Sequence, residues 1–247
     1  MAKPTPLQFS VKSNLLISPN MRRITVYGEG IAQYPENAAG NYIKLVFPQE
    51  DEQKPCLRTY TISQIDYEQC TMELDFVIHT DGGPASVWAD SARPGDTIQI
   101  GGPGPGKPIS LPADWFLIAG DMTAMPAIRN NLKQLPEDAR GYLVLEIISE
   151  EDKAALDAIT IPAALEVIWI INPEPGDLKK FSDAILQLPW LAGQPSVWIA
   201  AELEEVLKAR SHIKTQPPIE KGKMYISSYW QHGMTEDRHK VAKKEQL

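Results

Sequence analysis

The sequence predicts a two-domain α/β protein, with an antiparallel β-barrel in residues 1–110 and a parallel-sheet α/β domain in residues 111–247. Three observations support this prediction. Short extended segments separated by Gly, Pro and Asn fill the first part, a segment rich in Gly and Pro follows, and apolar strands then alternate with helical patterns. A chain of 247 residues has enough material for two ordinary domains.

The expected strands of the barrel are short and closely spaced. They are RRITVYG, NYIKLVFP, LRTYTISQI, TMELDFVIH and DTIQIGG, which begin at residues 22, 41, 57, 71 and 96. In TMELDFVIH the apolar residues Met72, Leu74, Phe76 and Ile78 share one face, and the other face includes Glu73, Asp75 and His79. We expect the apolar face in the core and the other face toward solvent or a ligand.

The segment GGPGPGKPISLP separates the two predicted domains. It holds four Gly and four Pro between Gly101 and Pro112, so regular structure stops there. Beyond it, the strand-like segments WFLIAG, GYLVLEII, LEVIWII, SVWIAA and KMYISSYW alternate with helical patterns. Nearly continuous apolar strands between helices are typical of βαβ units, in which helices cover both faces of a parallel sheet.

The composition excludes several classes of protein. The net charge of −8 argues against a nucleic-acid partner, which requires a basic surface. No apolar run reaches the ~18 residues of a membrane span, and MAKPTPLQFS lacks the features of a secretory signal. We therefore expect a cytoplasmic protein, and we expect a monomer. Cys56 and Cys70 show no CxxC or CxxH spacing, so we expect reduced thiols and no metal site.

The charge is unevenly distributed along the chain. Residues 206–247 contain nine basic and four acidic residues, whereas residues 111–205 carry a net charge of −10. The basic segment is either a solvated helix and tail or a surface that receives an anionic small molecule or protein.

The segment RTYTIS, which begins at Arg58, combines a guanidinium group with an aromatic ring. Arg58 and Tyr60 share one face of the expected strand, so Arg58 can hold a diphosphate while Tyr60 lies against a flat ring. Thr61 offers a hydroxyl or a backbone group to a ring nitrogen. The alternative is an ordinary strand with an exposed arginine and a packed tyrosine.

The segment GGPASVWADSARPGD predicts a glycine-rich turn that opens a helix. Pro84 suits the first helical turn, Ser86 supplies a hydroxyl there, and the helix should end before Pro94. Gly82 and Gly83 leave backbone N–H groups uncovered, and a helix start with uncovered amides attracts an anion. The alternative is a turn that only changes the direction of the chain.

Together these segments resemble the FAD-binding half of the siderophore-interacting protein family, a branch of the ferredoxin-reductase-like flavoproteins. The matching residues are Arg58, Tyr60 and Thr61, a strand that ends at His79, and then Gly83, Pro84, Ala85, Ser86 and Trp88. IAGDMTAMPAI and YWQHGMTED resemble the family's second-domain and C-terminal signatures. The resemblance spans about residues 10–239.

The resemblance implies one noncovalent FAD in the barrel. Arg58, Ser86 and the helix start would hold the diphosphate, and Tyr60, Thr61 and His79 would surround the isoalloxazine ring. The full set of expected cofactor-binding residues also includes Thr59, Gly83, Ala85, Trp88, Thr123 and Trp230. Two alternatives stay open: His79 bonded only to backbone, and Trp230 packed at the sheet edge instead of near the flavin.

The electron donor is less clearly indicated. LIAGDMTAMPAI contains Gly120 but no GxGxxG, and Asp121 would repel a diphosphate. Thr123 is the expected helix cap in this segment. The residues after the second strand, Ser149 to Asp152, include three acids, which suit a free 2′-hydroxyl and favour NADH over NADPH. A reduced ferredoxin remains an alternative donor.

The family resemblance implies reduction of ferric siderophores, with no catalytic side chain because the flavin performs the electron transfer. Fe(II) binds hard oxygen ligands less tightly than Fe(III), so reduction releases the iron. The expected receiving surface for an anionic chelate consists of Lys223, Arg238 and Lys240, with Lys54 beside the flavin strand. Two alternatives are a reductase of a protein acceptor such as ferredoxin or flavodoxin, and a binding module for siderophore or flavin without turnover.

Overall fold

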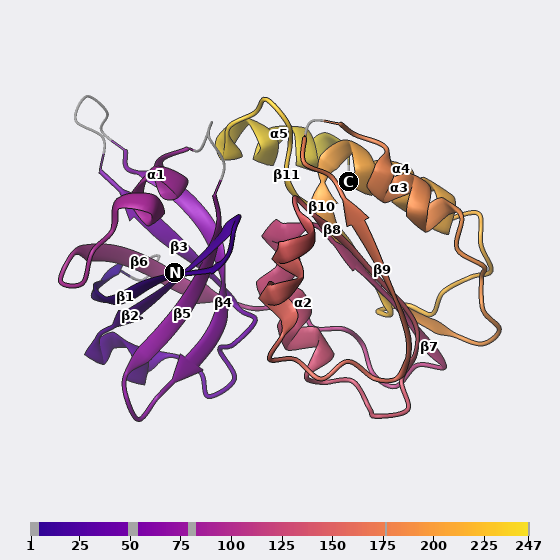
Figure 1. Ribbon diagram of the computed structural model, residues 1–247, viewed down its shortest axis with the longest axis horizontal. Helices are drawn as coiled ribbons and strands as arrows, with labels where there is room; N and C mark the ends of the chain where they lie inside the picture. The colour runs from indigo at the N-terminus through magenta and orange to yellow at the C-terminus, as the bar shows by residue number, and fades with distance from the viewer. Residues whose placement is uncertain (1–4, 49–53, 79–82, 176, 247) are drawn as a thin grey trace. The chain divides into compact units, whose positions relative to one another are not determined.

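The computed structural model describes residues 5–48, 54–78, 83–175 and 177–246. The chain divides into two compact units, Met1–Lys107 and Pro108–Leu247 (Figure 1). His79 and Gly82, which the sequence suggested for the flavin site, lie outside the described residues.

The first unit is a closed antiparallel barrel, as predicted, and it has six strands, of which the first (Leu7–Ser18) was not among the expected segments. A short 3₁₀ helix, η1 (Glu29–Gln33), connects its second and third strands. Around the barrel, the order is β1 (Leu7–Ser18), β2 (Met21–Tyr27), β5 (Thr71–Val77), β4 (Cys56–Asp66), β3 (Tyr42–Phe47) and β6 (Thr97–Gly104).

Strand β5 shows how the alternating sequence builds this barrel. Met72, Leu74 and Phe76 are fully buried in the core, as their spacing predicts. The expectation that the other face of β5 meets solvent or a ligand is wrong for Asp75, whose side chain is fully buried. Arg23 compensates for this burial through two bonds to the Asp75 carboxylate, of 2.7 and 2.9 Å.

The helix α1 (Pro84–Ser91) packs on the barrel core through its buried alanines and through Trp88. It ends three residues before Pro94, where the sequence predicted its end. The side chain of Asn14 donates to the carbonyl groups of Ala89 and Ala92, at 2.7 and 2.9 Å. These bonds satisfy carbonyls at the helix end and attach α1 to β1.

The second unit is a five-stranded sheet in which all neighbouring strands are parallel, as predicted. The strand order is β11 (Met224–Trp230), β10 (Pro195–Glu202), β7 (Trp115–Gly120), β8 (Arg140–Ile147) and β9 (Ala164–Ile171). The helices between and after these strands are η2 (Met122–Ala124), α2 (Met125–Leu132), η3 (Glu150–Leu156), α3 (Lys180–Leu186), α4 (Leu203–Ile213) and α5 (Glu236–Gln246).

Helices cover both faces of this sheet, as expected for βαβ units. The helices α3 and α4 lie side by side on one face, and α2 lies on the opposite face (Figure 1). Apolar residues of β7 and β10 pack against Phe181 and Ile185 of α3 and against Val206 and Ala209 of α4. Within the described residues, none of the helices combines the length and the apolar character that crossing a membrane would require.

Candidate functional site

The first candidate region consists of β4 and the start of α1. Strand β4 carries Arg58, Thr59, Tyr60 and Thr61, and it pairs with β3 along this whole stretch. The Tyr60 ring lies against Phe76 of β5, with centroids 4.4 Å apart. Phe76 in turn contacts Trp88 of α1, at 5.7 Å. The structure therefore brings Tyr60 and Trp88 into one aromatic cluster through Phe76.

Sequence reasoning missed the supporting role of Phe76 and of Phe47, whose ring meets Trp88 edge-on at 6.3 Å. The strand alternation placed Phe76 in the core but could not show which rings it would touch. Because both rings fix Trp88 and Phe76 also contacts Tyr60, we infer that they hold the orientation of the Tyr60 ring.

Arg58 and Thr59 lie on the same strand with different surroundings. Arg58 is half-buried, and its Nη1 donates to the carbonyl oxygen of Leu57 at 2.9 Å. Thr59 is exposed, and its hydroxyl receives a hydrogen bond from the Lys44 ammonium.

Among the described residues, the start of α1 is exposed at Gly83. Gly83 is the N-cap residue, and Pro84 follows in the first turn. No described atom lies within 4 Å of the place where a Cβ of residue 83 would stand. Its φ of −71° is also ordinary for any residue, so neither the backbone conformation nor described neighbours require glycine here. Ala85 and Ser86 are buried in the first helical turn.

These residues fit an FAD. A diphosphate needs a guanidinium group and an approachable helix start, which Arg58 and Gly83 provide. An isoalloxazine ring needs a supported aromatic surface with polar neighbours, which Tyr60 provides beside Thr59 and Thr61.

The second candidate region is the carboxyl edge of the parallel sheet, where ligands of such sheets bind. Asp121 follows β7 directly and is buried. Its Oδ1 accepts hydrogen bonds from the backbone N–H and the hydroxyl of Thr123, at 2.9 and 2.5 Å. Its Oδ2 accepts from Nε1 of Trp230 at 2.7 Å. Burial raises the pKa of Asp121 above its usual range, although these hydrogen bonds oppose the shift.

The expectation that Thr123 caps the helix is wrong. Asp121 is the N-cap residue of η2, because it has extended backbone angles and its carboxylate accepts from the Thr123 amide. Thr123 stands two residues too late to cap this turn, and its hydroxyl donates to the same carboxylate.

Two more carboxyl groups lie at this edge. Glu146 stands near the end of β8, and its burial, followed by the charge of Asp121, raises its pKa to about 7. Glu202 ends β10 and is buried. It caps α4 by accepting from the Glu204 amide at 2.6 Å, and its other oxygen accepts from the His232 amide at 3.1 Å.

The acidic segment after β8 is partly engaged within the protein. Ser149 and Asp152 form a capping box at the start of η3, in which the Ser149 amide donates to Asp152 at 2.9 Å. Glu150 pairs with Lys153, whereas Glu151 is exposed.

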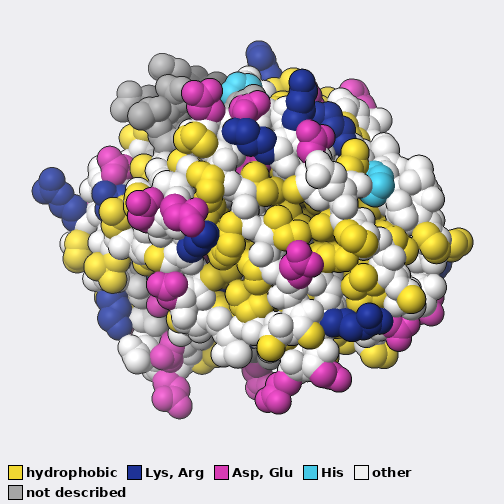
Figure 2. Space-filling model, turned by 45° about the vertical axis from the view of Figure 1, so that its right-hand side comes forward, with side chains coloured by type: hydrophobic (Ala, Val, Ile, Leu, Met, Phe, Trp, Pro, Cys, Tyr) yellow, Lys and Arg dark blue, Asp and Glu magenta, His cyan; other side chains and the backbone are white. Residues whose placement is uncertain are grey.

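The structure does not bring all the expected basic residues together. Lys223 stands just before β11, is 17% exposed and pairs with Glu220 at 2.9 Å. Arg238 and Lys240 lie on α5, which bonds to Ser227 and Ser228 near the other end of β11. Arg238 is exposed, and Lys240 pairs with Glu236 at 2.9 Å. Lys54 is exposed in the first unit. On the face drawn in Figure 2, basic side chains stand beside acidic ones at several places.

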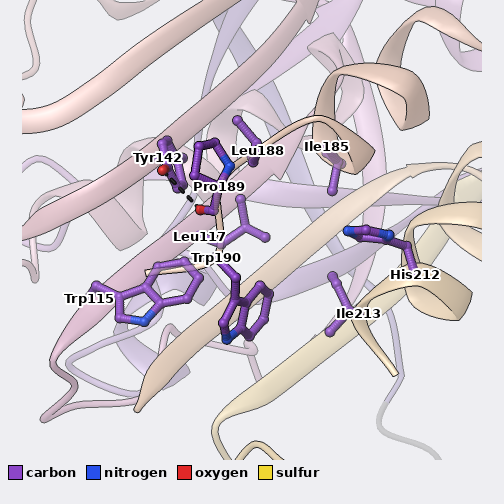
Figure 3. A pocket seen from close by; sticks show the side chains of 9 residues that line it. All are labelled: Trp115, Leu117, Tyr142, Ile185, Leu188, Pro189, Trp190, His212 and Ile213. Carbon is purple, nitrogen blue, oxygen red and sulfur yellow. Dashed lines mark hydrogen bonds between the residues drawn. The ribbon is translucent and has the colours of Figure 1, made fainter. Parts of the chain in front are cut away.

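The cavity in Figure 3 is not a ligand site. Its volume is about 10 Å³, which is room for at most one water molecule. It is lined by Trp115, Leu117, Tyr142, Ile185, Leu188, Pro189, Trp190, His212 and Ile213. Trp115 and Trp190 meet edge-to-face at 4.8 Å beside it, and the hydroxyl of Tyr142 donates to the Pro189 carbonyl at 3.0 Å. We assign it to imperfect packing.

Each of the two units matches a family model of the siderophore-interacting proteins. The siderophore-interacting FAD-binding domain matches residues 10–56 and 49–107, and the siderophore-interacting protein model matches residues 113–233. The ferric vibriobactin reductase ViuB of Vibrio cholerae is 32% identical over 242 residues, which cover 90% of this chain and 88% of that protein.

Two further proteins are similar over most of their length. The NADPH-dependent ferric-chelate reductase of Escherichia coli is 26% identical, over 87% of this chain and 88% of that one. The crystal structure of the siderophore-interacting protein SipS from Aeromonas hydrophila superposes with a TM-score of 0.87 at 31% identity, over 98% of this chain and 97% of that one.

Proposed function

The chain belongs to the siderophore-interacting protein family, and we propose that it is an oxidoreductase that uses FAD to reduce ferric siderophores. The observation that carries this proposal is the agreement between the family match and the local structure. The part of the chain that matches the FAD-binding domain contains Arg58, the supported ring of Tyr60 and a helix start at Gly83 that no described atom within 4 Å of its Cβ position obstructs.

In this proposal, Arg58 and the start of α1 with Ser86 bind the diphosphate of FAD. Tyr60, Thr59 and Thr61 bind the isoalloxazine ring, Ala85 and Trp88 support the site, and His79 belongs to the same set. FAD supplies the electron-transfer chemistry, and the protein binds and orients it. No side-chain nucleophile or acid–base pair is required for this function.

The proposed substrate is a ferric chelate with hard oxygen ligands, which hold Fe(III) more tightly than Fe(II). Many such chelates are anionic, so basic side chains should receive them. Arg238 on α5 is an exposed candidate, and Lys54 in the first unit is another exposed one. Lys240 on α5 is a further candidate, although it is only partly exposed and pairs with Glu236. Lys223 is the weakest candidate, because its side chain is mostly buried.

We propose a nicotinamide dinucleotide as the electron donor, bound at the carboxyl edge of the second unit's sheet. Two related proteins are named as reductases, the ferric vibriobactin reductase of Vibrio cholerae and the ferric-chelate reductase of Escherichia coli. The name of the second includes NADPH as its electron donor. For this chain we favour NADH, because Glu150 and Glu151 follow β8 and would repel a 2′-phosphate.

A reduced ferredoxin is the second candidate donor, and one observation favours it. The amides of Thr123 and Ala124 at the β7–α2 turn both donate to Asp121, to its carboxylate and to its carbonyl oxygen. These amides are therefore not available for a diphosphate.

An anaerobic assay tests the function. Protein reconstituted with FAD is mixed with NADH, NADPH or reduced ferredoxin and with a ferric catecholate or hydroxamate, and Fe(II) is trapped by a specific chelator. We expect Fe(II) only when FAD is present. If the protein holds FAD but produces no Fe(II) with any of the three donors, nor after chemical reduction, it is a binding module instead. Reduction of ferredoxin or flavodoxin but of no chelate would favour a protein acceptor.

A further inference from the structure

Two buried carboxylates hold the segment that follows the last strand of the second unit. Asp121, after β7, accepts a hydrogen bond from the indole Nε1 of Trp230 at 2.7 Å. Glu202, at the end of β10, accepts from the backbone N–H of His232 at 3.1 Å. Residues 230–232 are therefore tied to the ends of two other strands of the sheet.

The bond to Asp121 fixes the orientation of the Trp230 ring. Residue 230 pairs with Glu202 in the sheet, which fixes its backbone. The indole has one polar atom, Nε1, and a bond from that atom to a fixed acceptor leaves the ring little freedom to rotate. Asp121 is 7% exposed, so water hardly competes for its oxygens.

The acceptor is itself held rigidly. Oδ1 of Asp121 is bound by the amide and the hydroxyl of Thr123, which leaves Oδ2 directed at the indole. The preceding residue, Gly120, is closely packed: a Cβ there would lie 2.8 Å from the Cβ of Ala124 and from the carbonyl oxygen of Ala200. The turn that carries Asp121 is therefore closely packed at Gly120.

We propose that Asp121 is a positioning residue that holds the indole of Trp230 as a fixed wall at the carboxyl edge of the sheet. This inference rests on the proposed function in one respect, which is that this edge receives the dinucleotide donor. A fixed wall lowers the entropy cost of binding a flat ring beside it, because the indole is ordered before the donor arrives.

The variant Asp121→Ser tests this role without removing the helix cap. Serine is a good N-cap residue, so the Thr123 amide keeps an acceptor, but the shorter side chain does not reach the indole. Asp121→Ala removes both contacts. Asp152→Ala is the matched control, since Asp152 is a fully buried capping carboxylate of the same unit that holds η3.

The first readout is the exchange of indole N–H groups in ¹⁵N-labelled protein. The resonance of Trp230 is the one that disappears in Trp230→Phe. We expect this N–H to be protected in the parent protein and to exchange at least about 10-fold faster in Asp121→Ser, since it loses a bond to a charged group. Asp152→Ala should lower stability and leave this exchange rate unchanged.

The second readout is the reduction of protein-bound FAD by NADH and by NADPH. We expect Asp121→Ser to raise the apparent KM for the donor with little change in kcat. In the Trp230→Phe background the same substitution should have no further effect on KM, because Asp121 acts through the indole.

Two results would overturn the proposal. One is an indole N–H of Trp230 that exchanges equally fast in the parent and in Asp121→Ser. The other is a KM effect of Asp121→Ser that is as large in the Trp230→Phe background as in the parent protein. If neither dinucleotide reduces the FAD, the proposed donor fails, and the exchange rates alone decide whether Asp121 positions Trp230.

Discussion

Nε2 of His239 lies 2.8 Å from Oγ of Ser228, and this contact joins the C-terminal helix α5 to strand β11. His239 is the single buried residue among the eleven of α5. Nζ of Lys243 adds bonds to the Ser227 hydroxyl and the Ser228 carbonyl oxygen, at 2.5 and 2.7 Å. Polar contacts therefore hold α5 in place, with little apolar burial to support them.

We predict that α5 detaches more readily in acid. Burial, followed by the charge of Lys243, lowers the pKa of His239 below 6.5, and Lys240 lowers it further while Glu236 opposes the shift. The detached state therefore binds more protons than the docked state near pH 6, so docking weakens as the pH falls through that range. Amide hydrogen exchange of α5 at pH 5.5 and 7.5, corrected for intrinsic rates, measures this.

His239→Gln is the matched variant for that experiment, because glutamine forms hydrogen bonds but does not titrate. In His239→Gln, the protection of the α5 amides against exchange should be nearly independent of pH. An equal loss of protection in parent and variant would assign the effect to other groups.

We predict the opposite pH dependence from Glu146. Burial, followed by the charge of Asp121, raises its pKa to about 7. The folded protein therefore binds more protons than the unfolded chain between about pH 4.5 and 7, and this group lowers the free energy of unfolding as the pH rises. Glu146→Gln should reduce that decline, measured by urea unfolding at pH 5 and pH 8. Glu151→Gln, at an exposed site, is the control, and an identical pH dependence in parent and Glu146→Gln would contradict the prediction.

We predict that Arg58→Ala weakens FAD binding by about 10- to 150-fold, because charge-assisted bonds are worth roughly 1.5–3 kcal/mol. Titration of the apoprotein with FAD measures the affinity. Stability of the apoprotein should barely change, and urea unfolding of the apoprotein checks this. Arg93→Ala, at an exposed site outside β4 and α1, is the control. Equal affinity in Arg58→Ala and parent would remove Arg58 from the FAD site.

We predict that Gly83→Val weakens FAD binding without destabilising the apoprotein. The backbone of Gly83 has ordinary angles, and no described atom lies within 4 Å of the added Cβ position. A bulky side chain there would instead block the approach of a diphosphate to the helix start. Gly83→Ala should have a smaller effect on affinity than Gly83→Val. Unchanged FAD affinity in both variants would place the diphosphate elsewhere.

We predict that Arg238→Glu and Lys240→Glu slow the reduction of anionic ferric siderophores more than that of neutral ones. Attraction between exposed charges is screened over ~8 Å at physiological salt, so added salt should cause the same selective loss. Lys223→Glu should change these rates less, because the side chain of Lys223 is mostly buried. FAD content should be unchanged in all three. Equal responses of anionic and neutral chelates would show that α5 does not receive the substrate.

The sequence was sufficient to predict the fold. The barrel and the parallel sheet could be predicted because their signals are local in the sequence. These signals are the alternation in β5, the Gly and Pro residues between strands, and the apolar strands between helices. The assignment of residues on β4 and α1 to an FAD site stays a prediction.

Contacts between distant residues could not be predicted in this way. The bond between Asp121 and Trp230 joins residues 109 positions apart, and only the strand order brings them together. The sequence showed that an acidic residue follows the strand, but it did not show that Asp121 is a buried helix cap. The basic count of residues 206–247 likewise did not reveal that Lys223 and α5 attach near opposite ends of β11.

The most direct test of the proposed function is a single-turnover measurement. Protein with FAD bound is reduced anaerobically, freed of excess reductant and mixed with a ferric siderophore in the presence of an Fe(II)-specific chelator. Because two-electron-reduced FAD carries electrons for two ferric ions, the account predicts about two Fe(II) per FAD as the flavin absorbance returns. Reduced protein that keeps its electrons in the presence of ferric siderophores, yet passes them to a ferredoxin or flavodoxin, would contradict it.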